Sequence, residues 1–467
     1  MSALGQLAHS RRNVYILSFT FAIAAASGFG ATQLASVHGI VLTAVLAPLA
    51  VTHYFIAVRR NGLLSPDGLF FAAQLVMAVG TFQLADLTSP VDSEYSTIVA
   101  LACSAYTATS LLTYLAETRG KRTEPRYDVH VLAPTGSIKI GLAVSVLVVA
   151  AYFQAVGYSA FFVGLQGQLD GQKADVASLR LDSYAGGRYL FPGYVNQFKN
   201  AILPGLSLVF TTWATSRRGL LVRLLSWALL ALSAVGLMWT GQRGAFVSFV
   251  LTATLYAVLY NRKRLSRWML IIPLIGFPLL LLATTVLARG DSATEGITAR
   301  VLNDNQLSGL AAFRYTEPQP TQWGAEWGQA LMGVLPGNRG STLSGEVFAT
   351  LYGSTRGTSP PSLWGSVHYN FGLFGVLTLA VVLGVVVQLW TCRSLRGERY
   401  NTLQLAGFAG ATVSFGTWIA DGPTTLLNVG LVAYALLWWW GSRIAPAQEK
   451  GTAPRPGPKP PSCDGAF

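Results

Sequence analysis

Residues 366–391, SVHYNFGLFGVLTLAVVLGVVVQLWT, form a run of 26 residues without one Asp, Glu, Lys or Arg. A helix needs about 20 mainly apolar residues to cross the hydrocarbon layer of a membrane. The whole chain of 467 residues has a similar character, with 52% hydrophobic and 11% charged residues, whereas soluble domains carry about 25% charged residues. This composition excludes a soluble domain and predicts a polytopic integral membrane protein of the all-α class.

Further apolar windows along the chain bring the number of predicted spans to about twelve. The windows are 14–31, 38–58, 67–87, 96–116, 137–164, 191–214, 220–240, 244–260, 268–287, 366–391, 403–420 and 424–442. We expect the first to be retained, because no small-residue cleavage site follows it. Residues 1–442 are therefore predicted to form a transmembrane domain, and the Pro-rich residues 443–467 a disordered cytoplasmic tail.

The positions of the charges predict the orientation. With both termini placed in the cytoplasm, the cytoplasmic side receives 23 of the 33 Lys and Arg and seven of the 20 acidic residues. Cytoplasmic loops of membrane proteins are enriched in Lys and Arg in this way. The net charge of +13 is thus mostly a topology signal, and nucleic acid is not an expected partner.

Two predicted outer loops are longer than ordinary connections. They comprise residues 165–190 and 288–365, and the second contains Trp323, Trp327 and Trp364. Long connections in compact domains are usually functional or disordered. We expect the second loop to be partly helical, to fold against the membrane domain and to carry an extracytoplasmic site.

The sequence offers no sign of a cofactor or metal. Its three cysteines, Cys103, Cys392 and Cys463, are scattered, and metal sites need clustered ligands. A nucleotide-binding glycine loop and a nucleophile elbow are also missing from the sequence.

Basic residues on the predicted outer side stand against the positive-inside rule, and an Arg near that boundary is costly unless it is paired or binds an anion. Arg243 is the clearest, because it opens the window 244–260, where a helix N-terminus favours phosphate. Lys199 lies in Asn196-Gln197-Phe198-Lys199-Asn200, whose amides indicate a polar cavity. The other candidate substrate-binding cations are Arg180, Arg188, Arg339 and Arg356.

Three residues are candidates for a general base. His368 stands at the outer start of the window 366–391, and an imidazole can accept a proton from a hydroxyl at neutral pH. Glu326 and Glu346 in the long loop are the rivals. Each of the three also has an alternative without a catalytic role: His368 as an interfacial side chain, and the two glutamates as solvated loop carboxylates.

Two stretches resemble segments of the bacterial O-antigen polymerases. Thr240-Gly241-Gln242-Arg243-Gly244 resembles their S/T-G-x-R-G segment at a span entrance. Ser359-Pro360-Pro361-Ser362, followed by Asn370-Phe371-Gly372-Leu373-Phe374-Gly375, resembles the segment where their long outer loop re-enters the membrane. The number of spans and the two long outer loops agree with this family over most of the chain.

The resemblance implies a metal-independent glycosyltransferase in the bacterial inner membrane, with its active site facing outward. Its donor and its acceptor would both be undecaprenyl-diphosphate-linked oligosaccharides. It would contact membrane lipids, and its protein partners would be a flippase and a chain-length regulator. The cations above, with Asn196 and Asn370, would bind substrate. Two alternatives stay open: an O-antigen ligase, which transfers glycan to lipid A core, and a twelve-span transporter or flippase of lipid-linked oligosaccharides.

Overall fold

The computed structural model describes residues 46–118, 127–170, 179, 192–216, 219–239, 243–261, 305–333, 340–354, 357–394, 399–422 and 430–444. Most of the described chain is helical. Its helices and strands are α3 Ala47–His53, η2 Tyr54–Val58, α4 Arg59–Asn61, α5 Pro66–Leu84, α6 Pro90–Thr118, β1 Asp128–His130, α7 Gly136–Val156, α8 Ala160–Leu169, α10 Pro192–Gln197, η3 Phe198–Ile202, α11 Leu203–Thr215, α12 Leu220–Trp239, α13 Arg243–Asn261, α16 Asn305–Thr316, α17 Ala325–Met332, α18 Leu343–Tyr352, α19 Leu363–Arg393, β2 Arg399–Asn401, α20 Thr402–Asp421 and α21 Leu431–Arg443.

Six helices of the described part are long and apolar enough to cross a membrane. They are α5, α6, α7, α12, the Gly244–Asn261 part of α13, and α19. Each matches one of the predicted windows, so a mostly helical chain with helices suited to cross a membrane is confirmed. The windows 14–31 and 268–287 lie outside the described residues, and the number of twelve spans stays a prediction.

Two predicted windows prove to be broken helices. The window 137–164 contains α7, which ends at Gly157 with φ 75°, and then α8. The window 191–214 contains α10, the π-helical turn η3 and α11. Hydropathy alone does not detect such breaks, because the residues on both sides remain apolar.

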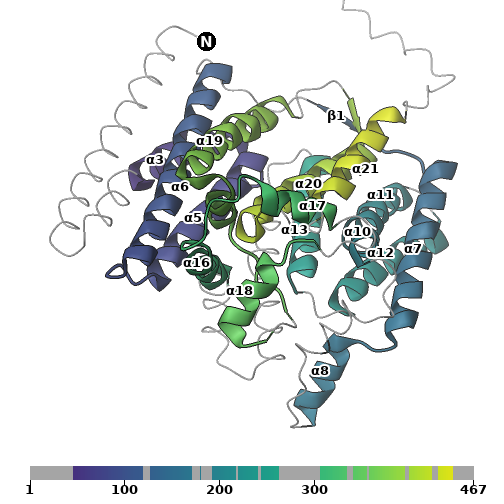
Figure 1. Cartoon of the computed structure of the whole chain (residues 1–467). Helices are drawn as coiled ribbons and strands as arrows, with labels where there is room; N and C mark the ends of the chain where they lie inside the picture. Colours follow the sequence, from purple (N-terminus) through teal and green to yellow (C-terminus); the bar gives the residue numbers. More distant parts are fainter. Residues whose placement is uncertain are drawn as a thin grey trace, which may run out of the picture.

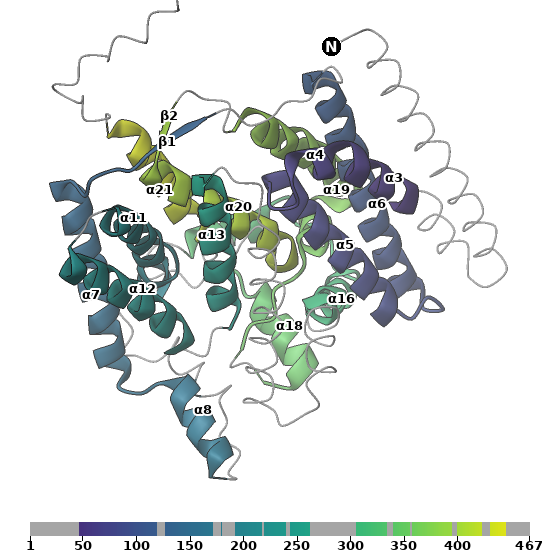
Figure 2. The same ribbon diagram turned by 180° about the vertical axis from the view of Figure 1, so that it is seen from behind.

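The helices form two groups around two apolar cores (Figure 1). The first group is α3, α5, α6, α16 and α19, around Phe70, Tyr106 and Trp364. The second is α7, α11, α12, α13 and α21, around Leu206 and Leu437. Seen from behind, α20 lies between the two groups (Figure 2), and it contributes side chains to both cores.

Close approach of α20 and α21 depends on small residues. A Cβ at Gly407 of α20 would meet the backbone of α21 at Tyr434 O, 2.7 Å away. A Cβ at Gly410 would overlap the ring of Tyr434. Small residues allow helices in membranes to pack backbone to backbone, where apolar surface gives no preference for protein over lipid.

The all-α prediction misses one small element. Strands β1 and β2 pair in parallel, with Asp128 opposite Arg399 and His130 opposite Asn401. Strands of three residues leave almost no hydrophobic period in the sequence. Both strands fall in connections predicted to be cytoplasmic, so their pairing places these two connections at the same end of the helices.

Two ion pairs also join helix ends. Arg393 Nε contacts Glu117 Oε1 at 3.0 Å, where α19 and α6 end. At the opposite end of α6, Arg314 of α16 makes two bonds to Asp92, of 2.7 and 2.6 Å. The first pair lies at the predicted cytoplasmic end and the second at the predicted outer end.

Reporter fusions test the predicted orientation. Fusions at Gln168 on α8 and Thr316 on α16 should read extracytoplasmic. Fusions at Arg122, Arg264 and Gly397, which lie outside the described residues, should read cytoplasmic, because the basic residues gather in those connections. A cytoplasmic signal at Thr316 would overturn the outer location of the site described below.

Candidate functional site

The stretch Asn370-Phe371-Gly372-Leu373-Phe374-Gly375 makes a kink in α19. At Gly372 φ is 64° and ψ is −168°, a combination that is essentially restricted to glycine. A Cβ at Gly375 would overlap Cβ of Phe371. Both glycines are therefore needed for the bend, which divides α19 into the outer segment Leu363–Phe371 and the longer segment that crosses the membrane.

The stretch Ser359-Pro360-Pro361-Ser362 anchors the start of α19. The hydroxyl of Ser362 accepts a hydrogen bond from Gly365 N at 3.1 Å and caps the helix. It also lies 2.6 Å from the hydroxyl of Tyr95 on α6. Ser308 of α16 donates to Pro360 O at 2.9 Å. These contacts tie the long outer connection to α6 where α19 begins.

Helix α17 docks on the outer segment of α19 through Glu326, which is 7% exposed. Asn370 Nδ2 donates to Glu326 Oε2 at 3.0 Å, and Ser341 Oγ donates to Oε1 at 2.6 Å. Trp327 packs on Phe371 with ring centroids 5.0 Å apart and donates to Ser366 Oγ. Glu326 and Asn370, both candidate site residues, are thus brought together, and both oxygens of Glu326 already accept hydrogen bonds.

Glu346 lies apart from this contact, on α18. Its two oxygens accept from Tyr315 OH at 2.9 Å and Thr342 Oγ1 at 2.8 Å, in an exposed position. The hydrogen bond to this carboxylate raises the pKa of Tyr315. The carboxylate therefore joins α18 to α16.

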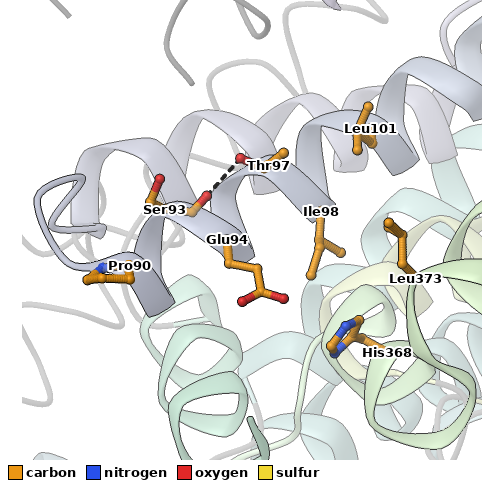
Figure 3. Close-up of a pocket in the computed structure, with 8 residues that line it drawn as sticks. All are labelled: Pro90, Ser93, Glu94, Thr97, Ile98, Leu101, His368 and Leu373. Carbon is orange, nitrogen blue, oxygen red and sulfur yellow. Dashed lines mark hydrogen bonds between the residues drawn. The ribbon is translucent and has the colours of Figure 1, made fainter. Parts of the chain in front are cut away.

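His368 faces a different space from Asn370. It lines a pocket of about 340 Å³ between α6 and α19, together with Pro90, Ser93, Glu94, Thr97, Ile98, Leu101 and Leu373. The imidazole of His368 and the carboxylate of Glu94 point into the same space (Figure 3). Phe313 of α16 packs against the imidazole, with ring centroids 5.2 Å apart. His368 is only partly buried, so this imidazole can be reached from the pocket.

Lys199 lies in the second helix group, in the π-helical turn η3. Its side chain is 1% exposed, and Nζ is 5.3 Å from the ring centroid of Tyr152 on α7. Asn196 lies one turn earlier, on α10. π-Helical turns inside helices are frequent at functional sites, and a buried ammonium is costly without partners. Lys199 thus lies inside the second helix group, and the polar cavity expected around it stays a prediction.

Arg243 is the first residue of α13, as its place before the window 244–260 predicts. Its side chain lies outside the described part of the structure. The four remaining candidate cations, Arg180, Arg188, Arg339 and Arg356, lie outside the described residues altogether. Their roles stay predictions.

Sequence reasoning missed a polar network at the other end of the first group. His53 Nε2 lies 2.9 Å from Asp67 Oδ2, and both side chains are fully buried. Tyr106 OH and Ser110 Oγ of α6 each donate to Asp67 Oδ1 at 2.8 Å. A His inside the window 38–58 and an Asp at the edge of the next were visible signs, because ionisable residues in spans are rare.

The described part of the structure contains no group of three His, Cys, Asp or Glu side chains that could hold a metal ion. The candidate site consists of an imidazole, carboxylates and amides near the predicted outer ends of α6 and α19. Compared with known protein families, curated proteins and solved structures, the chain matches none.

Proposed function

We propose that this chain polymerises undecaprenyl-diphosphate-linked oligosaccharide repeat units at the outer face of the bacterial cytoplasmic membrane. The product is a surface polysaccharide such as O-antigen, capsule or exopolysaccharide. The observation that carries the proposal is the assembly at the predicted outer end of α19. There, helices of the long connection pack on the outer segment, the N-F-G-x-x-G stretch bends, and a pocket holds His368.

The proposed reaction needs one base and a site for an anionic leaving group. The oxygen of an acceptor sugar hydroxyl bonds to the anomeric carbon of the donor, and the hydroxyl proton passes to His368. The bond between that carbon and the diphosphate oxygen breaks, and the diphosphate leaves with the electron pair. Lys199 and Arg243 supply positive charge for it, since charge-assisted contacts stabilise phosphate strongly.

Glu326 has a different part in this proposal. Because Ser341 and Asn370 already donate to its two oxygens, it holds α17 against α19 and so shapes the site. Glu326 also does not line the pocket that holds His368. We therefore propose His368, which faces the pocket, as the base.

The surface glycan of a deletion strain tests the proposal. A polymerase predicts loss of the polymer while a single repeat unit is still transferred to lipid A core. Lipid A core that carries no repeat unit would instead indicate that the protein is the ligase or the flippase. Growth of polymer as in the parent strain would contradict all three activities.

One observation favours the transporter as a second candidate. Transporters place ionisable groups inside the membrane domain, and the buried His53 and Asp67 form such a pair. A transporter requires this pair for movement of the lipid-linked unit. Purified protein in vesicles that flips the lipid-linked unit but does not lengthen it would replace the polymerase by this alternative.

Loss of the base is expected to slow polymerisation. His368→Ala should lower the rate by about 10²–10⁴-fold, the usual contribution of a general base, with unchanged amounts of protein in the membrane. The measurement is the length and quantity of polymer formed at equal protein level. If His368→Ala behaves as the parent protein while Glu326→Gln or Glu346→Gln abolishes polymer, the base is one of the two carboxylates.

A further inference from the structure

The pocket that holds His368 combines apolar and polar side chains from both of its helices. Ile98 and Leu101 of α6 and Leu373 of α19 make it apolar, whereas Glu94 and His368 bring polar groups. Its volume of about 340 Å³ is at the lower end of the range for small-molecule sites, roughly 300–1,000 Å³. A pocket of this size suits one end of an oligosaccharide.

The charges around the pocket are acidic. The carboxylates of Glu94 and Glu317 both act electrostatically on His368. Arg314, the described cation at this end, is bound to Asp92 through two hydrogen bonds. Among the described residues at this end, a diphosphate would meet the negative charge of Glu94 and Glu317, which disfavours the anionic part of a lipid-linked substrate in this pocket.

Glu94 is suited to bind hydroxyl groups. No described residue donates a hydrogen bond to its carboxylate, and the side chain is exposed toward the pocket. An ionised carboxylate only accepts hydrogen bonds, so its ligand is a hydrogen-bond donor, and a sugar hydroxyl is such a donor. The neighbouring apolar side chains of Ile98, Leu101 and Leu373 suit the C–H face of a sugar ring.

We infer that this pocket binds the uncharged terminal sugar of the acceptor, with Glu94 accepting hydrogen bonds from its ring hydroxyls beside His368. This inference rests on the proposed function, and it leaves the diphosphate of the donor outside this pocket. Glu94 is thus a binding residue that orients the acceptor, and His368 takes the proton of the hydroxyl so presented.

Protection of a cysteine in the pocket tests the inference on the purified full chain. The substitution Leu373→Cys places a cysteine in the pocket lining, where the parent leucine is 43% exposed. The natural Cys103 and Cys392 are buried, and Cys463→Ser removes the third. The probes are fragments of the host's surface polysaccharide, one repeat unit long and prepared by partial acid hydrolysis, and undecaprenyl diphosphate alone.

The fragments should slow maleimide labelling of Cys at position 373, and undecaprenyl diphosphate should not. Glu94→Gln should raise the fragment concentration for half-protection about tenfold, since the hydroxyls then bond to a neutral amide oxygen instead of a charged carboxylate. The matched control is Glu317→Gln, which removes the same charge from this end without lining the pocket. It should leave protection by the fragments nearly unchanged.

Three results would overturn the inference: no protection by the fragments, equal protection in Glu94→Gln, or protection by undecaprenyl diphosphate alone. The proposed function fails separately, when the parent protein does not lengthen lipid-linked repeat units. Protection without polymerisation keeps the sugar site and removes the polymerase. Polymerisation without protection removes this pocket alone.

Discussion

Arg243→Ala is expected to reduce polymerisation by about 10²–10³-fold, the typical cost of removing one donor that stabilises developing negative charge. Arg243 opens α13, and the first amides of a helix, together with its dipole, favour a phosphate group. An arginine at this place adds a charged fork that can hold two oxygens of the leaving diphosphate.

Arg243→Lys separates charge from geometry. An ammonium keeps the positive charge but offers no planar fork, so this variant should lose much of the activity and retain more than Arg243→Ala. The assay follows polymerisation of a purified lipid-linked repeat unit at equal protein level. Arg223→Ala is the matched control, because Arg223 is an exposed arginine of α12 at the predicted cytoplasmic end, and it should keep parent activity. Full activity in Arg243→Ala would remove the main support for a diphosphate site at α13.

Asp67→Ala is expected to lower the free energy of unfolding by about 3–5 kcal/mol, the usual cost of breaking a buried ion pair by removing one partner. Asp67 accepts hydrogen bonds from His53, Tyr106 and Ser110, and these link α3, α5 and α6. Without the carboxylate, the fully buried His53 and Tyr106 lose their partner, whereas Ser110 still reaches Gln388 Oε1 at 3.0 Å.

A double-mutant cycle with His53 tests the same contact. His53→Leu together with Asp67→Leu should cost less than the sum of the two single changes, because neither partner then remains alone in the core. Thermal unfolding in detergent measures each variant. Asp86→Asn is the control, since Asp86 is an exposed carboxylate and surface substitutions usually change stability by less than about 0.5 kcal/mol. Equal stability of Asp67→Ala and the parent protein would mean that the network contributes nothing to the fold.

The sequence predicts well what depends on local composition. Windows of apolar residues locate α5, α6, α7, α12, α13 and α19, because crossing a membrane is a property of about 20 consecutive residues. The resemblance also draws attention to Asn370 and Gly372, although their part in holding α17 and bending α19 is visible only in three dimensions. His53 and Asp67 escape notice, since a meeting of side chains from α3 and α5 leaves no periodic pattern.

Glu94 of the candidate site is a second example of a residue that the sequence alone does not connect to its neighbours. It lies 274 residues before His368 in the sequence, and only the packing of α6 against α19 brings both to one pocket. The residue type of Glu326 suggests a base, whereas its hydrogen bonds to Ser341 and Asn370 join α17 to α19. Pairings across long separations depend on tertiary contacts, which a single sequence does not report.

The place of α20 in the chain also bears on how the protein is made. This helix supplies Trp418 to one apolar core and Leu403 to the other, yet it begins only at Thr402. While the ribosome still synthesises the preceding residues, the helices already inserted lack the element that lies between the two groups. The strand β1 likewise can pair only after β2 has been synthesised, because Asp128 pairs with Arg399. Assembly of the two groups into one body is therefore a late event in biogenesis, completed by roughly the last seventh of the chain.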